Sequence, residues 1–370
     1  MRSWLARRAV RAARVLVVEC PGSWEVRVAV ERAVRARGWR LALSPASADV
    51  LVVTGLADGE MAEIVERHWD AMPGPRARGR AESAAAVADV LDAAVLDLVD
   101  DGTQRTDADG RSGSASGDPA RADDSTGHGE MDHGEMDHGE MDHGGMDHGE
   151  MDMAPDGIPL AGASEHDRDG LEMDELPLRL GPVLPAWPAG LVLDLVLHGD
   201  LVVAATGSFV PVGAPAEVGA ALVGARRCDD LAAMLDLAGW PDGAARARRA
   251  RDAALDGRDE VAVTVLSALR RRIESSRTLR WSLAGAGHVT AESAPGFHVP
   301  EWLVGDCHDR LLVLADRARA ATSGEGADVS SAELVGPETV AALVTGLDVG
   351  EARLVVASLG ATAVREVVDV

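Results

Sequence analysis

Histidine and methionine recur at a fixed spacing in residues 127–153, where a Met-Asp-His-Gly unit returns every five residues. Imidazole nitrogen is a good ligand for Cu(II), Ni(II) and Zn(II), and the thioether sulfur of methionine suits Cu(I). The candidate metal ligands are His128, Met131, His133, Met136, His138, Met141, His143, Met146, His148, Met151 and Met153. The repeat therefore predicts capture of Cu, Ni or Zn. Its selectivity should be poor, because no fixed scaffold imposes a coordination geometry.

The same repeat is also explained as a solvated tether that binds metals only because any histidine tract does. A step of five residues advances about 500° around an α-helix, so the histidines spiral and form no face. Residues 97–176 carry 24 acidic residues against 4 arginines, a net of −20 out of the −25 of the whole chain. We therefore expect residues 100–170 to be a disordered acidic linker. Nucleic acid is disfavoured as a partner.

The three cysteines, Cys20, Cys228 and Cys307, form no Cys-x-x-Cys pair, which fits a reducing cytosol. The opening residues carry arginines but lack the apolar core and cleavage site of a secretory signal. No run approaches the roughly 20 apolar residues of a transmembrane helix. We expect a cytoplasmic protein. Its basic opening, with Trp4 and Leu5, fits either a peripheral contact with the inner face of the cell membrane or a solvated helix.

The first 99 residues alternate short β-branched runs with segments of helical periodicity, a pattern typical of a parallel α/β sheet. The predicted strands are residues 14–19, 39–43 and 48–54, and the predicted helices are residues 24–37, 60–72 and 80–99. We expect these elements to form one α/β domain over residues 1–99.

From residue 171 to residue 370 we expect an α+β domain, made of a β-hairpin and a mainly helical bundle. Alternating leucines predict strands on either side of a turn at residues 198–200. Apolar periodicity predicts helices over residues 216–238, 244–255 and 259–276, with two more between residues 336 and 370. Three consecutive helices favour a bundle.

Three motifs in the first domain carry a resemblance to a known family. They are C-P-G-S-W-E at residues 20–25, A-D-V-L-V-V-T-G at residues 48–55 and H-W-D-A-M-P-G-P-R at residues 68–76. In this order they resemble the small iron–sulfur subunit of respiratory NADH-quinone oxidoreductase and of nickel–iron hydrogenases. That family holds a 4Fe–4S cluster with four thiolates. Here Cys20 is a lone remnant and Ser23 stands in the place of the second early cysteine, so the resemblance implies this fold without the cluster.

The second domain resembles the large subunit of the same complexes. Residues 181–190, G-P-V-L-P-A-W-P-A-G, are similar to its amino-terminal hairpin signature, and G-D-C-H-D-R at residues 305–310 is similar to its Gly-Asp-Cys-Tyr-Asp-Arg stretch. Both hairpin histidines of the family are replaced, the first by Leu184, and the chain has no tyrosine. Two Cys-x-x-Cys pairs that would hold nickel and iron are missing as well. The resemblance therefore implies neither a nickel–iron cofactor nor catalytic residues.

Three functions are compatible with these observations. The resemblance favours a non-catalytic scaffold subunit of a membrane-associated NADH-quinone oxidoreductase or hydrogenase-like respiratory complex, with the other subunits as partners. The repeat favours a metal-handling protein, and an active quinone oxidoreductase subunit is the third alternative. Small and large subunits sit face to face in the resembled complexes, so the two halves should pack against each other. Cys307, His308 and His298 are a further thiol–imidazole or metal candidate, although neighbours on one helix point about 100° apart.

Overall fold

The amino-terminal part of the computed structural model is a four-stranded parallel sheet with the order β2-β1-β3-β4. The structure describes residues 10–115, 160–161, 173–211, 220–290, 300–325 and 334–364. The four strands are β1 Arg14–Glu19, β2 Arg40–Leu41, β3 Val50–Thr54 and β4 Ala77–Ala81. Every residue of β3 is buried, as expected for a central parallel strand with both faces covered. The predicted parallel α/β fold is confirmed.

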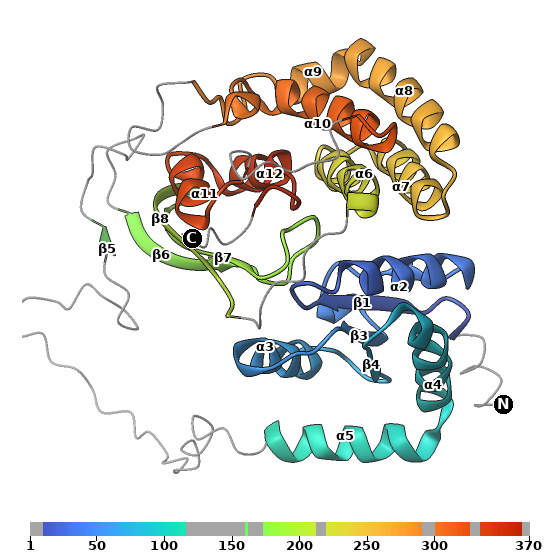
Figure 1. Cartoon of the computed structure of the whole chain (residues 1–370). Coiled ribbons are helices and arrows are strands. Elements are labelled where there is room, and N and C mark those ends of the chain that lie inside the picture. Colours follow the sequence, from blue (N-terminus) through green and yellow to red (C-terminus); the bar gives the residue numbers. More distant parts are fainter. Residues whose placement is uncertain are drawn as a thin grey trace, which may run out of the picture.

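Helices cover both faces of this sheet (Figure 1). Successive side chains of a strand point to opposite faces, and β1 shows this clearly. Val15 packs with α2 (Trp24–Ala36) and α4 (Val87–Val99) on one face. Leu16 and Val18 pack with α3 (Gly59–Asp70) on the other face. Apolar residues at helical spacing therefore bury one stripe of each helix against the strands.

The helix predicted over residues 80–99 is wrong in its first part. Strand β4 occupies Ala77–Ala81, a 3-10 turn follows at Ala84–Ala86, and only then does α4 begin. The strand has the sequence ARGRA, in which only the two terminal alanines are buried. A Cβ atom on Gly79 would lie 2.5 Å from Val90 Cγ1, so this glycine allows α4 to approach the strand closely. An edge strand with so little apolar surface gives no period-2 signal.

The disordered linker predicted from residue 100 is also wrong at its start, because helix α5 spans Asp101–Ala115. Arg76 holds this helix. Gln104 exchanges two hydrogen bonds with the Arg76 backbone, at 3.0 and 2.9 Å, and Arg76 Nη2 lies 2.9 Å from Asp107 Oδ1. The guanidinium also stacks 4.0 Å from the Trp69 ring centroid. Glycines and short polar residues make α5 a poor helix by propensity, so these tertiary contacts stabilise it.

The carboxyl-terminal part opens with an antiparallel sheet in the order β5-β6-β7-β8. Its strands are β5 Leu160–Ala161, β6 Met173–Leu180, β7 Leu191–His198 and β8 Leu201–Phe209. The predicted hairpin is confirmed as β7 and β8, joined at Gly199-Asp200, and Gly199 has a φ of +62°. The alternating leucines place Leu191, Leu193 and Leu195 on the buried face of the hairpin. Strand β6 adds to the open edge of β7.

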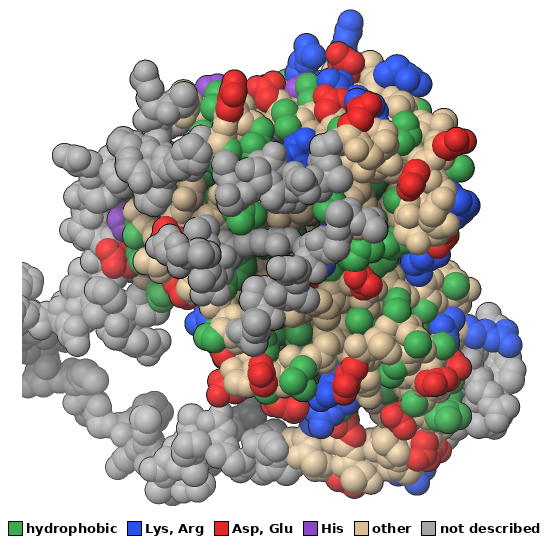
Figure 2. Space-filling view, viewed as in Figure 1, with side chains coloured by type: hydrophobic (Ala, Val, Ile, Leu, Met, Phe, Trp, Pro, Cys, Tyr) green, Lys and Arg blue, Asp and Glu red, His purple; other side chains and the backbone are tan. Residues whose placement is uncertain are grey.

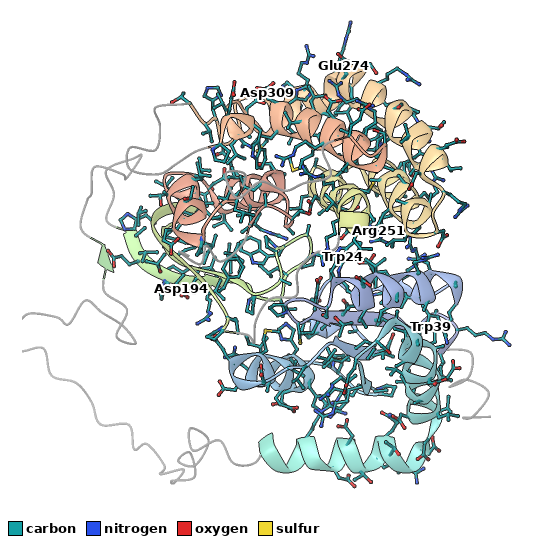
Figure 3. The ribbon with its side chains drawn as sticks, viewed as in Figure 1. Trp24, Trp39, Asp194, Arg251, Glu274 and Asp309 are labelled. Atoms are coloured by element: carbon teal, nitrogen blue, oxygen red, sulfur yellow. The ribbon has the colours of Figure 1, made fainter. Side chains whose placement is uncertain are left out.

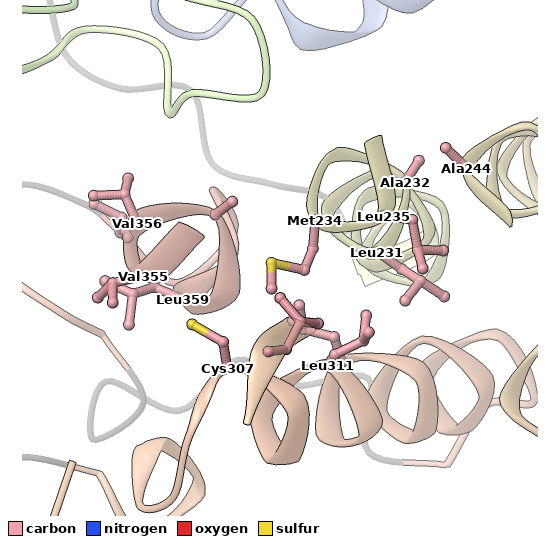
Figure 4. Close-up of a cluster of buried hydrophobic side chains, with 14 of the residues drawn as sticks. Leu231, Ala232, Met234, Leu235, Ala244, Cys307, Leu311, Val355, Val356 and Leu359 are labelled. Carbon is pink, nitrogen blue, oxygen red and sulfur yellow. The ribbon is translucent and has the colours of Figure 1, made fainter. Parts of the chain in front are cut away.

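Seven helices in the described residues complete the carboxyl-terminal part. They are α6 Ala220–Leu237, α7 Pro241–Leu255, α8 Asp259–Ser275, α9 Arg277–Leu283, α10 Cys307–Thr322, α11 Pro337–Val344 and α12 Val349–Leu359. Side chains of α6, α10 and α12 meet in one core, and the Cys307 sulfur points into it (Figure 4). Figure 2 shows acidic and arginine side chains interspersed over the visible surface. Within the described residues no helix is long and apolar enough to span a bilayer.

Candidate functional site at the junction of the two halves

The carboxyl ends of β1 and β3 form the point where the strand order reverses. From β1 the chain leads to β2 on one side, and β3 lies on the other. In open α/β sheets ligands bind outside the carboxyl ends of the strands at such a switch point. Cys20 follows β1 and Gly55 follows β3, so two of the three motifs that carry the resemblance meet here.

Ser23 ties these two strand ends together. Its hydroxyl lies 2.6 Å from the carbonyl oxygen of Cys20, 2.9 Å from that of Thr54 and 2.8 Å from the Thr54 hydroxyl. Both Ser23 and Thr54 are buried. A Cβ on Gly55, where φ is +82°, would lie 2.9 Å from Ser23 Cβ. The strand ends are therefore packed directly on each other.

Cys20 does not have the properties of a cluster ligand. Its side chain is buried, and burial, with added repulsion from Asp58 and Glu19, raises the pKa of the thiol to about 11. Metal binding and nucleophilic attack require the thiolate. Cys228 and Cys307 lie in the carboxyl-terminal core, and burial raises the pKa of Cys228 to about 12. A 4Fe–4S cluster needs four thiolates, so the residues at this edge do not fit one.

The carboxyl-terminal half closes this edge. A Cβ on Gly190, which has a φ of +86°, would lie 2.7 Å from Pro21 Cγ. Val192 of β7 and Val210 after β8 belong to the same buried cluster as Cys20. The other matched residues shape the approach to β7, since a Cβ on Gly181 would lie 2.1 Å from the Leu191 carbonyl oxygen. The expectation that the two halves pack against each other agrees with these contacts.

A buried cluster of charges joins α2 to α6 and α7 beside this edge (Figure 3). Arg251 of α7 is 0% exposed, and its Nη1 lies 2.5 Å from Asp229 Oδ1 and 2.8 Å from Glu31 Oε2. Arg27 Nε lies 2.6 Å from Glu19 Oε2, and Arg27 also pairs with Glu31 and Asp229. We call Glu19, Arg27, Glu31, Asp229 and Arg251 the junction cluster.

The electrostatics of the junction cluster follow from burial and from the two arginines. Burial opposes ionisation of Asp229, but Arg27 and Arg251 together hold the pKa of Asp229 well below its usual range. The same balance lowers the pKa of Glu31. At Glu19 the effect of burial is larger than the attraction of Arg27, so the pKa of Glu19 is raised. Trp24 Nε1 donates to Asp229 Oδ2 at 2.9 Å, which satisfies a further acceptor of the cluster.

Exposed ion pairs extend the contact along α2. Arg32 pairs with Asp256 at 2.8 Å, and Arg35 pairs with Asp252 at 2.9 Å. Such pairs are individually weak because water screens them. Apolar contact continues beneath them, where Trp24 and Val28 of α2 pack on Ala225 of α6. These junction residues carry little signal in the sequence beyond the spacing of four between Arg27 and Glu31.

The G-D-C-H-D-R stretch begins α10 and organises the loops around it. Arg310 is 0% exposed and donates to the carbonyl oxygens of Leu303, Gly305 and Gly287 at 3.1, 2.7 and 2.9 Å. Its Nη2 lies 3.3 Å from Cys307 Sγ. The thiol therefore contacts Arg310 and lies in the carboxyl-terminal core. This position of Cys307 agrees with the expectation that Cys307 and His308, about 100° apart on one helix, are poorly placed to act together, and His298 lies outside the described residues.

The eleven candidate metal ligands between His128 and Met153 also lie outside the described residues. Comparison of the chain with protein-family models, with curated proteins and with solved structures gives no match.

Proposed function

We propose that this chain is a non-catalytic scaffold subunit of a membrane-associated respiratory complex of the NADH-quinone oxidoreductase or hydrogenase type. The observation that carries the proposal is the direct contact between Pro21 and Gly190 at the carboxyl ends of β1 and β3. Both residues belong to the motifs that resemble the small and the large subunit. In those complexes the cluster and the substrate lie between the two subunits, and here protein fills the corresponding edge.

The side chains at this edge support a structural role. The Ser23 hydroxyl hydrogen-bonds to backbone carbonyl oxygens at the two strand ends, and Cys20 is a buried thiol with a raised pKa. Neither group offers the charge or the open position that electron transfer through a cluster requires. The junction cluster supports the same conclusion, because buried ion pairs fix one relative arrangement of the elements that carry them. A scaffold needs a fixed arrangement of its two halves to present a constant surface to partners.

Affinity purification from mild-detergent extracts of membranes, with a tag on the chromosomal copy, tests this proposal. The expected result is co-purification of integral membrane subunits and redox subunits in stoichiometric amounts. The variant Gly190→Val should reduce this recovery, because a side chain there collides with Pro21. Val261→Ser, at a half-exposed position of α8, is the matched control and should recover the partners fully. Recovery of the tagged chain alone, from the soluble fraction only, contradicts the proposal.

A metal-handling function is the second candidate, and the repeat of five histidines and six methionines favours it. Under this function Cu, Ni or Zn would bind to imidazole and thioether groups. The test replaces the five histidines by Gln and, separately, the six methionines by Leu. Histidine-dependent binding should weaken below pH 6 as imidazoles protonate, whereas Cu(I) on thioethers should change little. If both variants bind as much metal as the parent, the repeat is not a metal site and serves only as a tether.

A further inference from the structure

We propose that Asp306, His308 and Asp309, at the start of α10, form a binding site for a divalent first-row transition-metal ion. One ring nitrogen of His308 and one oxygen from each carboxylate lie within 4.8 Å of one another. Ligands about 2.1 Å from such an ion stand at most about 4.2 Å apart. The observed limit is therefore close to the spacing that coordination of one ion requires. The inference rests on these three residues and is independent of the proposed scaffold function.

His308 provides the observation that points to a ligand. Its side chain is buried, at 5% exposure, and Nε2 has no hydrogen-bond partner within the part of the chain that the structure describes. Buried polar atoms almost always have a partner, because an unsatisfied one carries a free-energy cost. Neutral imidazole with a free nitrogen is a common metal ligand. The proposed ion would coordinate one nitrogen of this buried imidazole, beside the two carboxylates.

The first turn of α10 holds both carboxylates in place through a capping box. Asp306 Oδ1 accepts the backbone N–H groups of His308 and Asp309, each at 2.9 Å, and Oδ2 accepts that of Gly285 at 2.9 Å. A carboxylate has about four lone-pair positions, so these three bonds leave one position of Asp306 for an ion.

Asp309 closes the capping box from the other side. Its Oδ2 accepts the Asp306 backbone N–H at 3.2 Å. Figure 3 shows Asp309 at the outer end of α10. The helix amino terminus carries about +0.5 of a charge, which two carboxylates outweigh. One imidazole with two carboxylates suits Zn(II), Ni(II) or Mn(II), with water in the remaining positions. Cys307 takes no part, since its sulfur lies in the core.

Zinc binding by the full-length chain tests this site. The parent protein carries Gln in place of the five repeat histidines, so that the repeat offers no imidazole. Equilibrium dialysis with zinc chloride should then give one Zn²⁺ per chain, with a dissociation constant in the micromolar range. His308→Gln and Asp309→Asn should each weaken binding at least tenfold. Glu301→Gln changes a nearby exposed acid outside the triad and should bind Zn²⁺ as the parent does.

A thermal melt with and without Zn²⁺ gives the second readout, because a ligand of the folded state raises its melting temperature. The increase should occur in the parent and in Glu301→Gln and be absent from Asp309→Asn. Asp309 is exposed and asparagine retains an oxygen that can accept the Asp306 N–H, so this variant decides the question if His308→Gln unfolds. The proposal is overturned if the parent binds no Zn²⁺, or if a folded Asp309→Asn protein binds it unchanged.

Discussion

Replacing Arg251 with methionine removes a buried guanidinium but keeps much of its aliphatic volume. Arg251 is 0% exposed, and its Nη1 contacts Asp229 and Glu31 at 2.5 and 2.8 Å. Without it, the carboxylates of Glu19, Glu31 and Asp229 face Arg27 alone. Removing one partner of a buried ion pair costs about 3–5 kcal/mol, because the remaining charge stays buried. We expect the free energy of unfolding of Arg251→Met to fall by about this amount.

The measurement is urea unfolding of the full chain, followed by circular dichroism at neutral pH. Arg258→Met, in the turn between α7 and α8, is the matched control. Its pair with Asp256 is 2.8 Å long, and the two side chains are 58% and 34% exposed. Exposed pairs contribute about 0–1 kcal/mol, so this control should stay within about 1 kcal/mol of the parent.

A double-mutant cycle identifies the partner of Arg251. Glu31→Gln removes one of the two carboxylates that contact Nη1. If the pair interacts directly, the combined cost of Arg251→Met and Glu31→Gln should fall short of the sum by about 1–3 kcal/mol. The reasoning is refuted if Arg251→Met costs no more than Arg258→Met, or if the cycle gives strict additivity.

Three further predictions concern other parts of the chain. Burial raises the pKa of Asp230 to about 6, above its unfolded value of about 3.9, so the protonated form stabilises the fold at low pH and the contribution is lost as pH rises through 6. Asp230→Asn should therefore exceed the parent in urea stability at pH 7.5 by up to about 3 kcal/mol and match it near pH 3. Gly190→Val should cost about 1–3 kcal/mol more than Gly239→Val, since both have positive φ but only Gly190 faces another side chain, that of Pro21. Deleting residues 116–159 should change the melting temperature by less than about 2 °C, because their composition favours little burial, whereas a deletion that begins at residue 101 should lower it by removing the partners of Arg76. Equal melting temperatures of the two deletion variants in a calorimetric scan would contradict the stabilising role of α5.

Apolar patterning made most of the regular elements predictable. β1 and β3 are short valine-rich runs, and α8 was predicted within one residue of its observed bounds, Asp259–Ser275. Two of the elements that patterning missed, β4 and α5, lack an apolar signal of their own. β4 buries only Ala77 and Ala81, so its place in the sheet depends on pairing with β3. α5 contains glycines and polar residues, and its helix depends on Arg76, which lies 31 positions before Asp107.

The candidate site was predictable only in part, because contacts between residues far apart in the sequence leave no local pattern. Parallel strands bring their carboxyl ends to one edge, so Cys20 and Gly55 could be placed together from the sequence. The junction cluster could not, because Arg27 and Asp229 are 202 positions apart and Glu31 and Arg251 are 220 apart. On a helix each of these charges is indistinguishable from a solvated one. Only the docking of α6 and α7 on α2 removes water from them.

The burial of the junction cluster has a consequence for how the two halves are oriented. An apolar contact, such as that of Trp24 and Val28 with Ala225, has no directional preference and tolerates sliding. The junction cluster does not, because a displacement of a few ångströms would leave Asp229 or Glu31 without a guanidinium, in a place where an unpaired charge is costly. The apolar contacts therefore favour association without fixing its geometry, and the junction cluster selects one orientation. That selection places Gly190 over Pro21 and seals the carboxyl edge of the sheet.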